Sequence, residues 1–539
     1  MRKTIALLLA LLLAVLCAAC TPTNDDSADI VPEPSDAPEQ SPQISIQPQK
    51  EQRTLVLAAR VYFDGYYDPF YTEWFSGNVF ECLMGIGENG EYCGVLAENW
   101  SVSDDYLTWQ FKIKDNVFFS DGTVCDAAAI AESWELLCKD ENIMFDGWLK
   151  NINVVSWAAK ENNVFEIVLS SPCPWMLDKM CCSDMHIISP SAIKLHGVGP
   201  ALALVGTGPY KVTEASSEKL VLTAFDGYHN ENKKAKIEKI ELRCDYLNER
   251  SKYALLNKDI DGFIFEDSDL CAYLESEFDG SLCTVTRGSN PMWLNAGKVT
   301  EFQLKEVRKA ISCLIDLEEL NEQAFAGYGR VQTGIWADDA PAYVKADVSY
   351  DEKLGLDLLS SVGMTPEDIS FVHRRMQPEA DYTLADALCE QLNAVGVDMS
   401  IETLGPEWSF TPLMDGTWAV EFNFSGYGSI MAHVPWSFIL GENPLVPMVR
   451  QDIYAPELYA AVCGEYDLAL NSASWEEYVS HLREVTRLVQ EDYAVLPGVT
   501  EPYFAAISSD FEGLRLRKVY LVGGSERYVI ALNELNFSE

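Results

Sequence analysis

The sequence predicts a mixed α/β protein that is built from more than one lobe. The chain has 539 residues, which is more than a single hydrophobic core usually serves. Residues 107–114 alternate between apolar and polar side chains, which is the period of a half-buried β-strand. Residues 304–315 instead place Val307 and Ile311 on one apolar helical face. Both periods recur along the chain, so we expect strands and helices in the same fold.

The N-terminus reads as a signal peptide over residues 1–19. Arg2 and Lys3 give it a positive start, and residues 5–16 form an apolar run too short for a stable membrane span. The run ends in Cys17-Ala18-Ala19-Cys20, which resembles the lipobox of bacterial lipoproteins. This resemblance implies cleavage before Cys20 and lipidation of its thiol. The alternative is ordinary secretion with no lipid.

Residues 20–50 are predicted to be a lipidated, disordered linker. They combine six prolines with acidic and small polar residues, and such a stretch buries too little apolar surface to fold. Proline and like charges keep it extended. We therefore expect a solvated tether that holds the folded part away from the membrane.

The first half of the folded part is predicted to be rich in strands. It opens with an apolar strand and an aromatic-rich loop, and later reaches a turn at Asp121-Gly122. The predicted elements are strands at 54–58, 107–114, 164–169 and 220–225, and a helix at 127–137.

The second half is predicted to be richer in helices. Thr300 and Gln303 have the spacing of a capping box directly before the apolar face at 304–315. Gly363 is expected to stop another helix over 351–362. Further helices are predicted over 385–392 and 475–488.

The charge balance is strongly acidic. The chain has 39 basic and 83 acidic residues, a net charge of −44, and removal of residues 1–19 with Arg2 and Lys3 makes it −46. Nucleic acid is excluded as a partner because binding it requires a basic footprint. Two interpretations of the acidity stay open: it favours cationic solutes, or it serves only solubility.

Cysteines and histidines show no metal-site pattern. Thirteen of the 15 cysteines lie beyond Cys20, and no pair of Cys-x-x-Cys motifs indicates zinc. The odd number leaves at least one thiol unpaired within the chain, and either a reducing habitat or a few disulfides fits the rest. The six histidines are not at paired ligand spacing, although His433 lies near the segment discussed below. We predict neither a metal site nor a cofactor.

Several motifs in a fixed order resemble one family. Val95-Leu96-Ala97-Glu98-Asn99-Trp100 comes first, followed by Phe119-Ser120-Asp121-Gly122-Thr123. The most specific string is Val205-Gly206-Thr207-Gly208-Pro209-Tyr210-Lys211-Val212, in which the glycines relieve a tight backbone passage. Val307-Arg308-Lys309-Ala310-Ile311 and Val495-Leu496-Pro497 follow. Together they are similar to the bacterial extracellular solute-binding proteins of family 5, the peptide/nickel-binding class of ABC transporters.

This resemblance implies an α/β, two-lobed periplasmic-binding-protein-like fold (class II/cluster C) with an additional domain inserted in the first lobe. Lobe I is expected to be discontinuous, from residues 51–95, 206–285 and 505–539. The inserted domain is expected at 96–205, and lobe II at 286–504.

Family membership also implies a ligand site in a cleft between the lobes, lined by aromatic and a few polar side chains. Many peptide-binding members carry an Asp that holds the ligand's ammonium group, but the corresponding residues 422–427 contain no carboxylate. Glu421 or Glu501 is the available substitute. For each aromatic candidate, simple core packing is the alternative. The predicted ligand-binding residues are Tyr62, Phe63, Tyr66, Trp293, Asn295, Asn423, Phe424, Ser425 and Tyr427.

The expected function is reversible capture of a peptide or similar polar solute and its delivery to an ABC transporter permease, with no chemistry. The protein is expected to be a monomer on the outer face of the cell membrane or in the periplasm, lipid-anchored. Two alternatives are a secreted hydrolase and a sensor that uses the same fold. The chain contains no Gly-x-Ser-x-Gly elbow, His-Glu-x-x-His motif or P-loop that would favour an enzyme.

Overall fold

The computed structural model describes most of the chain beyond the predicted linker. The described residues are 53–59, 69, 72–87, 90–140, 143–200, 203–244, 249–286, 288–376, 383–404, 418–421, 456–521 and 526–538. The predicted signal peptide, Cys20 and the linker lie outside them. No helix among these residues is long and apolar enough to cross a membrane.

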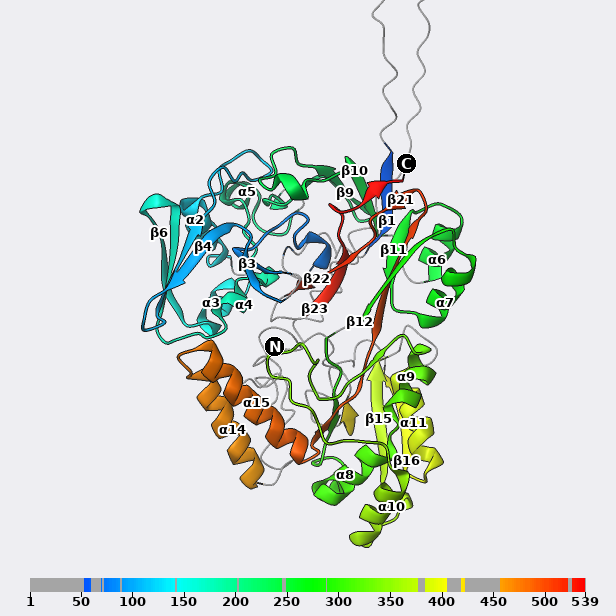
Figure 1. Ribbon diagram of the computed structural model, residues 1–539. Helices are drawn as coiled ribbons and strands as arrows, with labels where there is room; N and C mark the ends of the chain where they lie inside the picture. Colours follow the sequence, from blue (N-terminus) through cyan, green and yellow to red (C-terminus); the bar gives the residue numbers. More distant parts are fainter. Residues whose placement is uncertain are drawn as a thin grey trace, which may run out of the picture. The chain divides into compact units, whose positions relative to one another are not determined.

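A seven-stranded sheet gathers three distant stretches of sequence (Figure 1). β1 lies in its interior and pairs in parallel with β10 and β11, whereas β20, from near the C-terminus, is antiparallel to β11 and β12. Leu55 and Leu57 of β1 are fully buried. In sheet order the strands are β12 (Gly280–Thr286), β20 (Pro502–Ser508), β11 (Gly262–Phe265), β1 (Thr54–Ala58), β10 (Lys239–Arg243), β9 (Lys219–Ala224) and β8 (Tyr210–Ala215). Helices α6 (Glu249–Leu256) and α7 (Ser268–Glu277) accompany this sheet.

A separate four-stranded antiparallel sheet follows the first strands of the chain. Its order is β4 (Ala97–Val102), β5 (Thr108–Ile113), β7 (Val164–Leu169) and β6 (Val154–Lys160). β5 confirms the strand predicted from alternation, because Trp109, Phe111 and Ile113 are buried and Gln110 is exposed. The accompanying helices are α2 (Ala127–Leu137), α3 (Phe145–Asn151), α4 (Met176–Lys179) and α5 (Pro190–His196). One hydrophobic core contains residues of this sheet and of the seven-stranded sheet.

The second half of the chain builds a second hydrophobic core. A three-stranded sheet places β13 (Met292–Leu294) between β17 (Val420–Glu421) and β18 (Val495–Leu496), and β15 (Ser370–Met376) pairs in parallel with β16 (Asp398–Leu404). The helices are α8 (Lys305–Leu314), α9 (Leu317–Phe325), α10 (Glu352–Ser361), α11 (Leu384–Ala394), α14 (Pro456–Leu470) and α15 (Trp475–Glu491). Val307 and Ile311 of α8 are buried, which confirms the predicted helical face.

The capping box predicted at Thr300 and Gln303 is wrong. Residues Thr300–Gln303 form a short 3₁₀ helix, and α8 starts after it at Lys305 without a side-chain cap. The Thr300 hydroxyl donates instead to the Glu301 carboxylate at 3.2 Å. The position of α8 is therefore determined by burial of its apolar side chains and not by a capping residue at its N-terminus.

The two glycines of the most specific sequence motif do occupy a tight passage. A Cβ on Gly206 would lie 2.1 Å from the Val79 carbonyl oxygen, and one on Gly208 would lie 2.5 Å from the Asn78 carbonyl oxygen. Both obstacles are backbone atoms, so a side chain at either position requires the backbone to move. The motif thus fixes the approach of the strand at Tyr210 to the segment at residues 76–83.

Burial keeps neutral a histidine that contacts this segment. His186 is 2% exposed, with Nδ1 2.7 Å from the Pro69 carbonyl oxygen and Nε2 3.2 Å from Ser76 Oγ. Desolvation lowers the pKa of His186 to about 4. The unfolded chain, with an ordinary histidine pKa near 6.5, therefore binds a proton between pH 6.5 and 4 that the folded chain does not.

We expect acidification from pH 7 to 4.5 to remove stability through this residue. The loss from His186 alone is about 2 kcal/mol over this range, because pH 4.5 lies about two units below the unfolded pKa and still above the folded pKa of about 4. Urea denaturation of the wild type and of His186→Gln at both pH values measures it. The variant should lose about 2 kcal/mol less between the two pH values, and parallel losses in both proteins would contradict the assignment.

Candidate functional site

Two chain crossings connect the seven-stranded sheet with the sheets of the second half. The first runs from Thr286, the end of β12, to Met292, the start of β13. The second runs from β19 (Val499–Thr500) to Pro502, the start of β20. We name the described residues within 53–286 and 502–538 the first body, and those within 288–500 the second body.

The two crossings run side by side. Thr286 pairs with Pro502 on the side of the first body, and Met292 pairs with Leu496 on the side of the second. Between them, Asn290 Nδ2 donates to the Val499 carbonyl oxygen at 3.0 Å. Two short paired crossings between larger packed bodies are the geometry of a hinge, since a few residues absorb the change in backbone angles.

Buried polar groups of the second body hold the first crossing in place. Ser289 is fully buried, and its Oγ accepts from the Ala337 backbone N–H at 2.7 Å. The Asn290 backbone N–H donates to Gln332 Oε1 at 2.8 Å. A buried donor or acceptor without a hydrogen bond costs free energy, so these bonds hold the crossing in one path.

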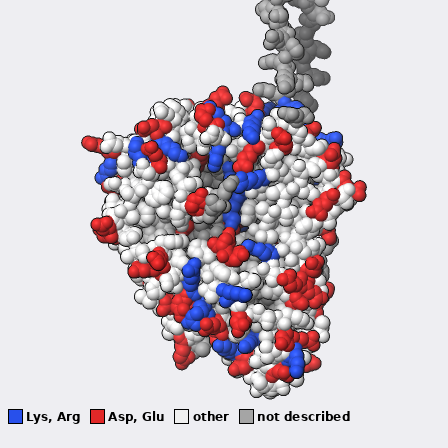
Figure 2. Space-filling model, in the orientation of Figure 1, with Lys and Arg blue, Asp and Glu red and all other residues white. Residues whose placement is uncertain are grey.

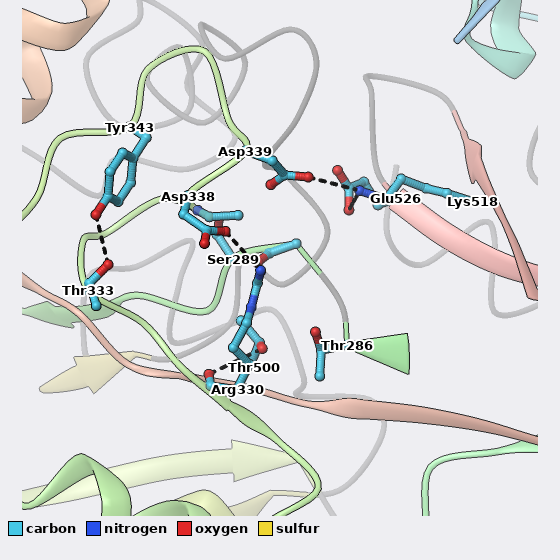
Figure 3. A network of polar contacts seen from close by, with 12 residues as sticks. Thr286, Ser289, Arg330, Thr333, Asp338, Asp339, Tyr343, Thr500, Lys518 and Glu526 are labelled. Carbon is cyan, nitrogen blue, oxygen red and sulfur yellow. Dashed lines mark hydrogen bonds and ion pairs between the residues drawn. The ribbon is translucent and has the colours of Figure 1, made fainter. Parts of the chain in front are cut away.

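A buried ion pair of the first body lies against the same crossing (Figure 3). It comes from the hairpin of β22 (Leu516–Tyr520) and β23 (Glu526–Ile530). Lys518 Nζ lies 3.3 Å from the Glu526 carboxylate and 3.8 Å from Asp339 of the second body. Glu526 is fully buried, and a Cβ on Gly288 would lie 2.8 Å from its Oε2. Gly288 is thus the residue that lets the crossing pass this carboxylate.

The charge of Lys518 depends on these carboxylates. Burial alone would lower the pKa of Lys518, but the charges of Glu526 and Asp339 outweigh it and raise the pKa above its usual value. The ammonium group is therefore retained at physiological pH. It contributes an ionic contact between the two bodies beside the crossing.

Arg330 approaches the crossing from the second body. It lies on β14 (Arg330–Val331), which pairs with β19. Its Nη2 donates to the Gly288 carbonyl oxygen at 3.1 Å, and its Nη1 donates to Asp338 at 3.0 Å. Figure 3 shows Arg330 and Asp338 near Ser289 and Thr500, and Thr333 bonded to Tyr343 beside them. Gly288 is therefore contacted by charged side chains of both bodies.

Figure 2 shows one face of the molecule hollowed near its centre, with Lys, Arg, Asp and Glu side chains around the hollow. Concave sites that combine a shielded surface with a few oriented polar groups are where proteins bind small ligands.

The structure places two of the predicted ligand-binding residues in the interior. Trp293 lies in β13, is 1% exposed and pairs with Glu421 and Val495. Asn295 is equally buried; its Nδ2 donates to the Trp418 carbonyl oxygen at 2.7 Å, and its Oδ1 accepts from the backbone of Gly297. The described amide contacts of Asn295 hold the turn after β13. The other predicted residues lie outside the described part of the chain: Tyr62, Phe63, Tyr66, Asn423, Phe424, Ser425 and Tyr427.

Sequence reasoning did not find Arg330, Asp339, Lys518 and Glu526. They are far apart in the chain, and no local motif marks them among 122 charged residues, 39 basic and 83 acidic.

The described histidines and cysteines do not form a metal site. Within the described ranges, no group of three or more His, Cys, Asp or Glu residues is arranged to hold a metal ion. No disulfide joins the thirteen cysteines in those ranges.

Two mixed α/β bodies joined by paired crossings define the class of two-lobed periplasmic binding proteins. The chain belongs to the bacterial extracellular solute-binding proteins, family 5, whose middle-region model matches residues 91–439. The predicted family and two-lobed fold are thereby confirmed. The chain is a substrate-binding protein of the class that serves ABC transporters. The hydrolase and sensor alternatives are not favoured.

Individual relatives show the same relationship. The glutathione-binding protein GsiB of Salmonella paratyphi A is 25% identical over 461 residues, which cover 80% of this chain and 85% of GsiB. The nickel-binding periplasmic protein of Escherichia coli K12 is 26% identical over 463 residues, covering 79% and 85%. The crystal structure of NikA from Brucella suis in complex with Fe(III)-EDTA has a TM-score of 0.76 at 20% identity, covering 90% of this chain and all of NikA.

Proposed function

We propose that this protein captures a short peptide or a similarly sized polar solute between its two bodies and delivers it to an ABC transporter permease. Family membership is the observation that carries the proposal. The relatives named for glutathione, itself a small peptide, and for nickel support a compact polar ligand. The paired crossings at Gly288 and Thr500 support closure by a hinge. The function has no chemical step.

The domain division that we propose follows the predicted one. Lobe I comprises residues 51–95, 206–285 and 505–539, an inserted domain spans 96–205, and lobe II spans 286–504. The separate pairing of β4, β5, β6 and β7 supports an inserted unit, although it shares a core with lobe I. We further propose a signal peptide at 1–19, a lipid anchor at Cys20, and a monomer tethered outside the cell.

The ligand contacts are proposed at the aromatic loop Tyr62, Phe63 and Tyr66 and at 423–427. Trp293 and Asn295, also predicted at the site, are proposed as its buried support. Asn423, Phe424, Ser425 and Tyr427 take the place of the family's Asp-containing segment, so the ligand's amine, where present, needs another carboxylate. Glu421 and Glu501 are the proposed substitutes.

A thermal-shift screen with peptides, sugars and metal chelates tests this function. A bound solute stabilises the folded protein by mass action, by about 2.7 kcal/mol at a concentration of 100 times its Kd. The melting temperature rises accordingly. Asn423→Ala is expected to weaken the shift while the unliganded protein keeps its melting temperature. Asn295→Ala is the contrast, because loss of its turn contacts should lower the melting temperature of the unliganded protein.

Different outcomes of the screen test the place of Asn423 in the site and the proposed function itself. An unchanged shift in Asn423→Ala would remove Asn423 from the site. No shift with any member of the panel would refute capture of a peptide or similar polar solute. Turnover of a bound peptide would replace the binding function with hydrolysis.

A further inference from the structure

The hairpin of α14 and α15 belongs to the second body by sequence, because it lies between β17 and β18. Its buried residues belong to a hydrophobic core that contains residues of both bodies. α15 begins at Trp475, after Ser474 caps it by accepting from the Glu477 backbone N–H. Trp475 and Tyr478 lie three positions apart on one helical face, with ring centroids 5.3 Å apart. They form one side of an aromatic contact between the bodies.

The first body supplies the other side of this contact. Trp175 lies 5.4 Å from Tyr478, and Tyr92 lies edge-on to Trp475 at 6.5 Å, centroid to centroid. Tyr478 is fully buried and Trp175 is 4% exposed. We name Tyr92, Trp175, Trp475 and Tyr478 the aromatic seam.

The Tyr92 side of the seam is fixed in orientation. The Tyr92 hydroxyl donates to Asp178 at 2.6 Å, within the first body. Burial, together with the Asp178 charge, raises the pKa of Tyr92 well above its usual value, so the hydroxyl stays a donor. The ring is therefore presented to α15 in one position.

Other contacts between the bodies flank the crossings. The Tyr328 hydroxyl donates to Glu275, and its ring meets Phe504 of β20 directly after the second crossing. Lys518 meets Asp339 beside the first crossing. In contrast, Figure 1 shows the start of α15 below α3 and α4, across the view from β12 and its crossing. A rotation about the crossings displaces such a distant contact the most.

From this geometry we propose that the aromatic seam is a closure contact, which holds the bodies together without a solute and parts when the protein opens. The inference rests on the proposed function, because it assumes hinged bodies around a solute. Each stacked or edge-to-face ring pair favours the joined state by about two- to twelvefold. The protein therefore closes part of the time when empty, and the seam raises its affinity for a solute by up to the same factor.

Fluorine NMR of the full chain labelled with 5-fluorotryptophan tests this without a solute. Trp175→Phe identifies the Trp175 signal by its disappearance. In the wild type the fluorine chemical shift of Trp175 is expected to be the average of its values in the closed state, where the ring is buried, and in the open state, where it is exposed to solvent. Trp475→Ala should move it toward the exposed position, with a two- to twelvefold change in the population ratio, and should raise the radius of gyration by X-ray scattering.

Trp157→Ala is the matched control. Trp157 is also partly buried, and it contacts Trp134 inside the first body. This variant should lose stability but leave the Trp175 population and the radius of gyration unchanged. If Trp475→Ala does not fold, Trp475→Phe, which keeps a smaller ring, should give a smaller change in the same direction.

A Trp175 signal and a radius of gyration that stay at wild-type values in the folded Trp475 variants would overturn the proposal. The seam would then be a permanent interface. That result would leave solute binding intact, because the melting-temperature panel tests it separately. Conversely, a seam that opens in a protein that binds no solute would refute the proposed function alone.

Discussion

Replacement of Lys518 by methionine is expected to lower the free energy of unfolding by about 3–5 kcal/mol. The reason is the Glu526 carboxylate, which is fully buried and lies 3.3 Å from the Lys518 ammonium. Methionine keeps most of the volume but removes the Lys518 ammonium from beside this buried carboxylate. Urea denaturation of the wild type and the variant at pH 7 measures the loss.

A double variant separates the charge from the packing. Lys518→Met with Glu526→Leu removes both charges, and replacing a buried ion pair by apolar groups is often close to neutral. The double variant should therefore recover most of the stability lost in the single variant. A single variant within 1 kcal/mol of the wild type, or a double variant less stable than the single one, would contradict this account of the ion pair.

Replacement of Glu81 by alanine is expected to cost about 3 kcal/mol or more. Glu81 is 5% exposed, and its carboxylate receives hydrogen bonds of 2.9 Å from Thr207, Tyr228 and His229. Each buried donor left without an acceptor costs roughly 1–3 kcal/mol. Burial and the Glu81 charge also raise the pKa of Tyr228 well above its usual value, so its hydroxyl remains a donor that needs this partner. Thermal and urea unfolding measure the effect.

Glu132→Ala is the control for loss of a carboxylate alone. Glu132 pairs with Lys194 at the surface, where both side chains are about half exposed, and its removal should change stability by no more than about 1 kcal/mol. Thr207→Val, which deletes one of the three donors, should cost less than Glu81→Ala. Equal losses from Glu81→Ala and Glu132→Ala would show that the buried network does not stabilise the passage at Gly206.

Local patterns explain which parts of the fold could be predicted from the sequence. β5 and α8 were predictable because their apolar residues repeat at the period of the element, and burial of Phe111 and Ile311 follows. The motif at residues 205–212 was informative because its glycines meet backbone atoms. The capping box at Thr300 failed because a side-chain spacing does not specify which nearby group the hydroxyl bonds.

The candidate site was less predictable because its geometry is made by distant chain segments. Gly288 meets Glu526 across more than two hundred residues, and Lys518 meets Asp339 across a similar separation. No periodicity relates such positions. The prediction of Trp293 and Asn295 rests on residue type, and the structure buries both, Trp293 within β13 and Asn295 directly after it. Their predicted ligand contacts, and those of Asn423, stay predictions.

Closure of the two bodies around a solute is the central claim. X-ray scattering from the full chain, with and without a compound that raises its melting temperature in the screen, measures it most directly. Paired crossings at Gly288 and Thr500 that act as a hinge predict a smaller radius of gyration when that compound is saturating. Identical scattering profiles in the empty and saturated protein would contradict it.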